Sequence, residues 1–171
     1  MVSVVNTTFT FILNSDLDLL AMARKLWDVE YNPRKFSSLV MRLREPKATA
    51  MISKSGYVVL LGCRSWNDAR KASRRVARRV RRVVPDVEVT GLTLKNMVGA
   101  GKHDFNVRDY LSTVTRSTFH DYEIFPGVNV DLACGLMATV FNKGTFFITG
   151  AKCESDLEAG HLELMIKFYF N

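Results

Sequence analysis

The chain has 171 residues, 47% hydrophobic and 24% charged, which is an ordinary balance for a globular protein with a substantial core. No apolar stretch reaches the roughly 18 residues of a membrane span, and the opening MVSVVNTTFTF lacks the basic segment of a secretory signal. Residues 1–88 carry 17 Lys/Arg and 8 Asp/Glu, a net charge of +9, whereas residues 89–171 carry 7 and 9, a net charge of −2, so the first half favours a polyanionic partner over a merely solvated basic face.

The first half begins with a strand and a helix. Val4–Leu13 is rich in Val, Thr and Phe, which favours a strand. Helical spacing of apolar residues predicts a helix over Asp16–Trp27, capped by Asn14, Ser15 or Asp16, and Asn32-Pro33 indicates a turn. An antiparallel meander of short strands is expected next, at Ser38–Arg44, Thr49–Ser53 and Tyr57–Leu61.

The strongest helical pattern covers Ser65–Val84 and ends at Pro85. Ser65 and Asp68 resemble a capping box in which Asp replaces Glu. One stripe of this helix is apolar, formed by Ala69, Ala72, Val76, Val80 and Val83. Basic residues cover the rest: Arg70, Lys71, Arg74, Arg75, Arg78, Arg79, Arg81 and Arg82.

The same order of elements then starts again. The sequence predicts a strand at Val87–Val98, a helix at Asn106–Ser117, a turn at Phe125-Pro126-Gly127, strands at Leu136–Phe141 and Thr145–Gly150, and a helix at Glu154–Phe168. Matching residues recur at offsets of 90, 89, 88 and 88: Asn6 with Asn96, Phe36 with Phe125, Gly56 with Gly144, and Gly62 with Gly150. We therefore expect two repeats, 1–88 and 89–171.

No Pro/Ser/Gly-rich linker separates the two repeats, so we expect them to share one sheet. The predicted fold is α+β, an antiparallel sheet of about ten strands with the long helices on one face. The other face has no predicted cover, and a large uncovered apolar face is typical of a binding surface. A pseudo-twofold protein surface suits a roughly twofold object such as duplex DNA.

The cysteines and histidines do not indicate a metal site or a disulfide framework. Cys63, Cys134 and Cys153 are odd in number and have no zinc-type spacing, so we expect reduced thiols. The histidines, His103, His120 and His161, are scattered along the chain. We expect no metal and no cofactor.

Five motifs occur in order and resemble the TATA-binding protein family along residues 4–168. They are EYNPRKF at 30–36, MRLREP at 41–46, NMVG at 96–99, FPG at 125–127 and TGAK at 149–152. The resemblance implies a saddle whose curved sheet lies over a widened minor groove, with four helices on the convex face. That family is a standing example of minor-groove binding with a kink of about 80°.

The resemblance also implies roles for individual residues. Asn6 and Asn96 would donate to minor-groove acceptors near the pseudo-dyad, and Phe36, Phe125 and Phe141 would wedge between base steps. From residue type alone, core packing is the more frequent role of a phenylalanine, but Phe36 and Phe125 stand beside turn signals. The groove-lining residues would be Val59, Val98, Phe147 and Thr149, and the phosphate contacts Lys35, Arg42, Arg64 and Lys152.

Partner contacts follow from the same resemblance. Glu30 and Arg44 match positions that meet general transcription factor A, and the helix bearing Arg70, Arg74 and Arg78 matches a surface bound by regulators. The turn at residues 122–124 is two residues short where the family meets factor B, which weakens that expectation. A nuclear location and a homodimer through the concave sheet face are also expected.

Several positions depart from the family pattern. Ser53 stands where a second first-half wedge is usual, and Leu61 replaces a threonine. Thr8 replaces a groove-lining valine, and Phe147 is bulkier than the usual aliphatic residue. Asp131 stands in place of a phosphate-contacting arginine, and its charge would repel a phosphate. We therefore expect a divergent member with weaker or altered sequence preference.

Three other interpretations remain open. The chain could keep the fold but act mainly by engaging or sequestering transcription factors. The basic run Arg70–Arg82 could serve nuclear import or RNA binding. Gly99-Ala100-Gly101-Lys102 resembles part of a phosphate-binding loop, but Asn96 and His103 stand where the full motif needs Gly and Ser/Thr. We expect no enzymatic activity.

Overall fold

The computed structural model describes residues 1–108, 110 and 126–170. These residues form two compact units, one of residues 6–95 and one of residues 1–5 with 96–171. Strands β1 (Ser3–Leu13) and β6 (Val89–Lys102) contribute residues to both. The repeat boundary at 88/89 stays a prediction.

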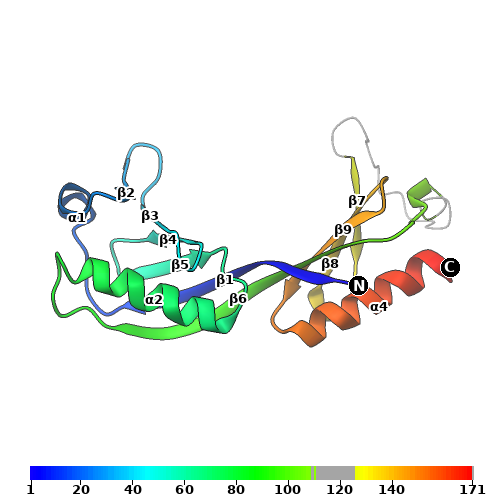
Figure 1. The fold of residues 1–171 in the computed structure, drawn as a ribbon. Coiled ribbons are helices and arrows are strands. Elements are labelled where there is room, and N and C mark those ends of the chain that lie inside the picture. The colour runs from blue at the N-terminus through cyan, green and yellow to red at the C-terminus, as the bar shows by residue number, and fades with distance from the viewer. Residues whose placement is uncertain (109, 111–125, 171) are drawn as a thin grey trace. The chain divides into compact units, whose positions relative to one another are not determined.

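The unit of residues 6–95 is an antiparallel meander with one long helix. Its strands neighbour one another in the order β2-β3-β4-β5-β1-β6. Figure 1 shows helix α2 lying along these strands. The elements not yet bounded are α1 (Leu19–Lys25), β2 (Val29–Glu30), β3 (Leu39–Leu43), β4 (Ala48–Ile52), β5 (Tyr57–Leu61) and α2 (Trp66–Val80).

Alternating burial along these strands forms the core of the unit. Every second residue of β4 and β5 is fully buried, and the apolar stripe of α2 is buried as well. At the start of the helix, the ring of Trp66 packs edge-on against Phe9, with centroids 4.9 Å apart. The core therefore lies between α2 and one face of the strands, and the other face faces away from the helix.

The second unit repeats this plan in the strand order β6-β9-β8-β7. Helix α4 supplies the buried residues Leu157, Gly160 and Leu164, and Figure 1 shows it as the last element of the chain. The elements are β7 (Gly127–Asp131), a short 3₁₀ turn (Ala133–Gly135), β8 (Met137–Phe141), β9 (Thr145–Ala151) and α4 (Glu154–Tyr169).

Most predicted elements are confirmed, with some corrections. The described residues form nine strands, against about ten expected, and three complete α-helices, while the fourth expected helix lies mostly outside them. The first helix is capped by Asp18, whose carboxylate accepts from the backbone N–H groups of Leu20 and Ala21 at 3.0 Å, and not by Asn14, Ser15 or Asp16. Strands β2 and β7 were not predicted, and the helix predicted at Asn106–Ser117 falls mostly outside the described residues.

The long helix α2 is shorter than predicted. Ser65 caps it as expected, because its Oγ accepts from the backbone N–H of Asp68 at 3.1 Å. The regular helix ends at Val80, and Val83 and Val84 close the segment with turn-type bonds to the carbonyl of Val80. Among the described residues no helix combines the length and apolarity that a membrane span requires.

Candidate nucleic-acid interface

The face of residues 6–95 that lies away from α2 is a mixed apolar and hydroxyl surface. Strand register places its side chains in two rows across neighbouring strands. One row runs Thr10–Val59–Met51–Val40, and the other Thr8–Leu61–Thr49–Arg42. We call this the open face of the first unit. The predicted groove residue Val59 lies on it, and so do the departures Thr8 and Leu61.

The second unit has a corresponding open face. Its rows are Ala100–Phe147–Thr139–Asn129 and Thr149–Met137–Asp131. Phe147 and Met137 are 38% and 42% exposed, although both are large and apolar. The ring of Phe141 meets that of Phe147 edge-on, with centroids 6.0 Å apart. The structure thus places Phe141, Phe147 and Thr149 on one surface, and their contact with DNA stays a prediction.

Val98 lies where the ladder between β6 and β9 is irregular. The register shifts between Met97 and Gly99, so Val98 lies opposite a bulge formed by Thr149 and Gly150 of β9, and it is half-buried. Bulges redirect side chains and are frequent beside functional sites. Position alone therefore leaves its groove-lining role a prediction.

The two predicted base-contacting asparagines have matching environments in the two units. The backbone N–H of Gly62 donates to Asn6 Oδ1 at 3.2 Å, and that of Gly150 donates to Asn96 Oδ1 at 2.9 Å. Both glycines have positive φ, 88° and 97°, a backbone region that favours glycine. The sequence shows these glycines only as a repeated pair, and the structure shows that they anchor the asparagines.

This anchoring sets which end of each amide remains for a ligand. Since an acceptor of a backbone N–H must be the oxygen, the nitrogen of each amide is the end left to donate. The minor-groove edge of an A·T pair offers only acceptors, whereas G·C adds a donor. Each asparagine therefore presents a donor suited to A·T pairs.

The predicted wedges differ in how far the structure describes them. Phe36 follows a turn in which its backbone N–H bonds to the carbonyl of Asn32 at 2.9 Å, and its side chain is 47% exposed. Phe141 is half-buried at the end of β8. Phe125 lies outside the described residues.

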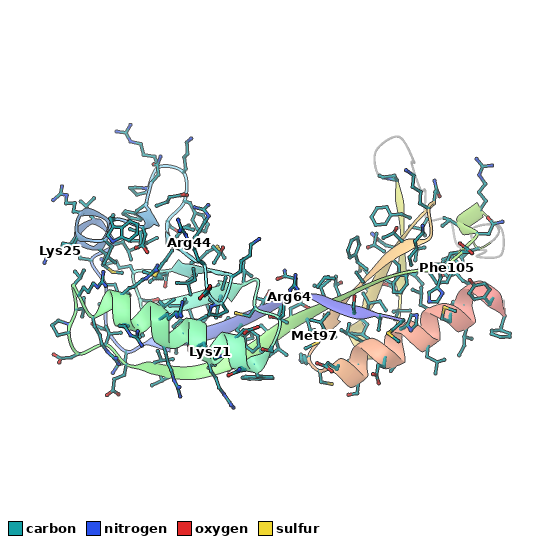
Figure 2. The ribbon with its side chains drawn as sticks, viewed as in Figure 1. Lys25, Arg44, Arg64, Lys71, Met97 and Phe105 are labelled. Atoms are coloured by element: carbon teal, nitrogen blue, oxygen red, sulfur yellow. The ribbon has the colours of Figure 1, made fainter. Side chains whose placement is uncertain are left out.

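The predicted phosphate contacts are all exposed, but they are not equivalent. Lys35, Arg64 and Lys152 are exposed, and Figure 2 labels Arg64 just beyond β5. Arg42 is ion-paired with Glu30, and both side chains lie largely in water. Such surface pairs are worth about 0–1 kcal/mol, so a phosphate could compete for the arginine.

Lys152 is held in place through its backbone. Its N–H donates to Asp156 Oδ2 at 2.9 Å, and that of Cys153 does so at 3.2 Å. The bond from Lys152 is the largest cause that lowers the pKa of Asp156, followed by a bond from the Cys153 side chain. This cap fixes the start of α4 and leaves the lysine side chain exposed.

The basic surface of α2 borders a groove. Arg70, Lys71, Arg74 and Arg78 are exposed, and Figure 2 labels Lys71 on α2. A groove of about 830 Å³ lies between α2 and the turn that carries Arg44. It is lined by Trp27, Asp28, Arg42, Leu43, Arg44, Glu45, Lys47, Arg75 and Arg79.

The charges in this groove are only partly balanced. Asp28 is ion-paired with Arg79, and Trp27 is 85% exposed. Five basic side chains line the groove against two acidic ones. The arrangement suits an acidic segment that also carries apolar residues.

The remaining chemistry does not form a catalytic set in the described residues. Gly99–Lys102 lies inside β6, with no helix following it directly, so it does not have the geometry of a phosphate-binding loop. The described residues contain no group of three metal-ligating side chains. Burial, with the nearby charge of Asp68, raises the pKa of the Cys63 thiol to about 11, which keeps it protonated and unreactive.

Two histidines that the sequence leaves far apart meet in the structure, which corrects the expectation that all three are scattered. His103 and His161 lie with their Nε2 atoms 2.9 Å apart. Phe146 stacks on both rings. Their separation of 58 residues offered no signal of this contact.

Comparison with known proteins gives consistent matches. A family model described as transcription factor TFIID (or TATA-binding protein, TBP) matches residues 1–83. The TATA-box-binding protein of Schizosaccharomyces pombe is 34% identical over 155 residues, covering 89% of this chain and 67% of that protein. The TATA-box-binding protein of Dictyostelium discoideum is 33% identical, covering 89% of this chain and 76% of that protein. That of Saccharomyces cerevisiae is also 33% identical, covering 89% of this chain and 65% of that protein.

A solved structure matches over almost the whole chain. Methanococcus jannaschii TBP superposes with a TM-score of 0.82 at 25% identity, covering 99% of both chains. The α+β fold of the chain is thus that of this relative. The chain spans 65–76% of the length of the three yeast and slime-mould relatives named above.

Proposed function

Since the chain belongs to the TATA-binding protein family, we propose that it is a non-enzymatic nuclear factor that binds A·T-rich promoter DNA from the minor groove. In this proposal the open face of each unit contacts the DNA. The phenylalanines bend the duplex, and the outer surface recruits general transcription factors.

The observation that carries the proposal is the matched pair of anchored asparagines. The amide oxygen of each is bonded to a backbone N–H, so each amide offers a donor. In the minor groove an A·T pair presents only hydrogen-bond acceptors, whereas a G·C pair presents an additional donor. Two such donors, one in each unit, support a preference for A·T pairs.

An exposed ring in one unit, Phe36, and a half-buried ring in the other, Phe141, support bending. Phe36 and Phe141 would enter opened base steps, with Phe125 as a third wedge on sequence grounds. Unstacking a base step costs a few kcal/mol, and an apolar ring can occupy the gap that results. Lys35, Arg42, Arg64 and Lys152 would contact phosphates, Arg42 after leaving Glu30.

The open faces also support a divergent preference. Asp131 lies directly across from Met137, an exposed open-face residue, so its carboxylate would face the DNA. Leu61 and Thr49 form a cross-strand pair in which the leucine brings no hydroxyl. We propose that these residues weaken or shift the sequence preference relative to the relatives named TATA-box-binding protein.

A second function is favoured by the basic groove beside α2. Here the chain would act mainly as an interaction module that engages or sequesters transcription factors. Arg44, with Glu30 and the exposed α2 residues Arg70, Arg74 and Arg78, would meet factor A or regulators of acidic character. A contact with factor B is less supported, because its expected turn is shortened in the sequence.

Fluorescence anisotropy with a TATA-containing duplex and a G·C-substituted duplex tests the two functions. A preference for the A·T duplex of about tenfold or more at several salt concentrations supports minor-groove recognition. Equal and steeply salt-dependent binding to both duplexes would favour the interaction module. Sedimentation at the same protein concentrations tests the proposed homodimer, which would cover the open faces and compete with DNA.

A further inference from the structure

The two units contain the same hairpin with its aromatic residue in different places. The turns are residues 54–56 between β4 and β5, and 142–144 between β8 and β9. Their glycines have nearly equal φ, 78° at Gly56 and 76° at Gly144, and bond back to Ser53 at 3.1 Å and to Phe141 at 2.8 Å. Ser53 therefore corresponds to Phe141, and Tyr57 corresponds to Thr145.

In the first unit the aromatic residue follows the turn, whereas in the second unit it precedes the turn. The second unit carries an aromatic before the turn and a small β-branched residue after it. The first unit carries a small residue before the turn and Tyr57 after it. Each hairpin thus keeps one aromatic side chain at its turn end, on opposite strands.

Tyr57 lies on the open face of its unit. Its neighbour Val58 is fully buried, so Tyr57 points to the opposite side of the sheet. It is 42% exposed, and its cross-strand partner Ile12 is 46% exposed. Together they extend the apolar part of the open face towards the turn.

Ser53 holds the backbone of Tyr57. Its N–H and its Oγ both donate to the carbonyl of Tyr57 at 2.9 Å, and its Oγ also lies 3.0 Å from that of Ser55. Because both bonds go to the backbone of the hairpin, the small Ser53 side chain stays close to that backbone. The tyrosine ring is the large side chain at this end of the hairpin.

Phe36 belongs to the same end of the unit. Ser37, the next residue, and Lys54 of the hairpin turn line one cavity of about 620 Å³ with residues of α1 and the segment before it. The segment after Phe36 and the hairpin turn before Tyr57 therefore border the same cavity. Phe36 and Tyr57 are 47% and 42% exposed, so both rings are accessible for stacking.

We propose that Tyr57 is a base-stacking residue that takes the place of the wedge missing at Ser53. The inference rests on the proposed function, because it assigns Tyr57 to the same DNA interface. The ligand would be the first-half end of an A·T-rich duplex, best at a pyrimidine–purine step, which unstacks most easily. Tyrosine is suited to the task, since its ring stacks and its hydroxyl can remain in water.

The test measures unstacking at each end of the site separately. A TATA-containing duplex would carry 2-aminopurine at one end or the other, and its fluorescence would report local unstacking when the full chain binds. Tyr57→Thr is the matched variant, because threonine occupies the corresponding place in the other hairpin. We expect it to lose the signal at one end only and to bind about tenfold more weakly.

Two further variants test whether the aromatic ring of Tyr57 causes the 2-aminopurine signal. Tyr57→Phe should keep the signal and bind within about twofold of the original chain, because the ring performs the stacking. Adding Ser53→Phe to Tyr57→Thr should restore the lost signal, because it recreates the arrangement of the other hairpin. Leu162→Ala, an exposed apolar position on α4, serves as the surface control and should change neither signal.

The result that would overturn the inference is a folded Tyr57→Thr variant that binds as tightly as the original chain and retains both signals. In that case a loss of signal with Phe36→Ala would still uphold the proposed function. If the original chain gives no signal at either end and no preference for the A·T duplex, both the inference and the proposed function are wrong.

Discussion

His103 and His161 share a hydrogen bond between their Nε2 atoms, 2.9 Å long, that joins the end of β6 to helix α4. Phe146 stacks on both rings, and Phe105 lies beside His103 and contacts Phe168 of α4. Figure 2 labels Phe105 in this cluster. A bond between two imidazole nitrogens needs one ring to be neutral, so the contact depends on pH.

The first prediction concerns acid stability. Burial lowers the pKa of His161, and the positive charges of the N-terminus and His103 lower it further. The unfolded chain then binds more protons than the folded chain below about pH 6.5, the ordinary value for histidine. The free energy of unfolding should fall as the pH drops through that value towards the lower folded pKa.

Urea unfolding at about pH 7.5 and about pH 5.5 measures this effect. His161→Gln should flatten the pH dependence, because its side chain cannot gain a proton. A variant with an unchanged pH dependence would show that other groups cause the loss.

The second prediction concerns the anchored asparagines. Asn96→Asp keeps an oxygen for the N–H of Gly150 but replaces the amide donor with a negative charge. Affinity for the A·T duplex should fall by about 1–3 kcal/mol or more, since a specific base contact is lost. Anisotropy titrations provide the measurement, and an unchanged thermal unfolding midpoint would show that the fold is intact. Tight, A·T-selective binding by this variant would contradict the assigned role.

The third prediction concerns salt. If Arg64 and Lys152 contact phosphates, then each change to alanine should reduce the slope of log K against log salt concentration by about 0.9. Arg74→Ala on the solvent side of α2 is the matched control, and its slope should stay as in the original chain. If the salt slopes of the Arg64→Ala and Lys152→Ala variants equal that of the control, then Arg64 and Lys152 do not contact phosphates.

The fourth prediction concerns the start of α2. Ser65→Ala removes the acceptor for the N–H of Asp68 and should destabilise the chain by about 1 kcal/mol. Ser65→Asp keeps an acceptor at the cap and should restore most of the loss. Chemical denaturation distinguishes the two, and equal stability of all three chains would show that the cap contributes nothing.

Much of the local structure could be read directly from the sequence. The strand Tyr57–Leu61 and the start of α4 at Glu154 lie where they are predicted, because a short apolar run bounded by turn residues and helical periodicity are both local patterns. The cap at Ser65 follows for the same reason. The choice among Asn14, Ser15 and Asp16 was wrong, since several polar residues precede that helix and Asp18 alone satisfies its first N–H groups.

Other elements exist only through partners far along the chain. Strand β2 has two residues, too few for a periodic pattern, and is defined by pairing with Val40 and Met41 of β3. The helix α2 ends at Val80 although apolar residues continue to Val84, because tertiary packing and turn hydrogen bonds determine the last helical residue.

The sequence by itself determined the duplicated plan, the uneven charge, and the paired asparagines and glycines, because each is a property of residue order and spacing. Only the tertiary structure decided that Gly62 and Gly150 hold the oxygens of those asparagines, that His103 meets His161, and that Tyr57 shares the open face with Ile12. These contacts join residues 45 to 58 positions apart in the chain. Strand register and helix docking bring such residues together, and neither is encoded in any local pattern.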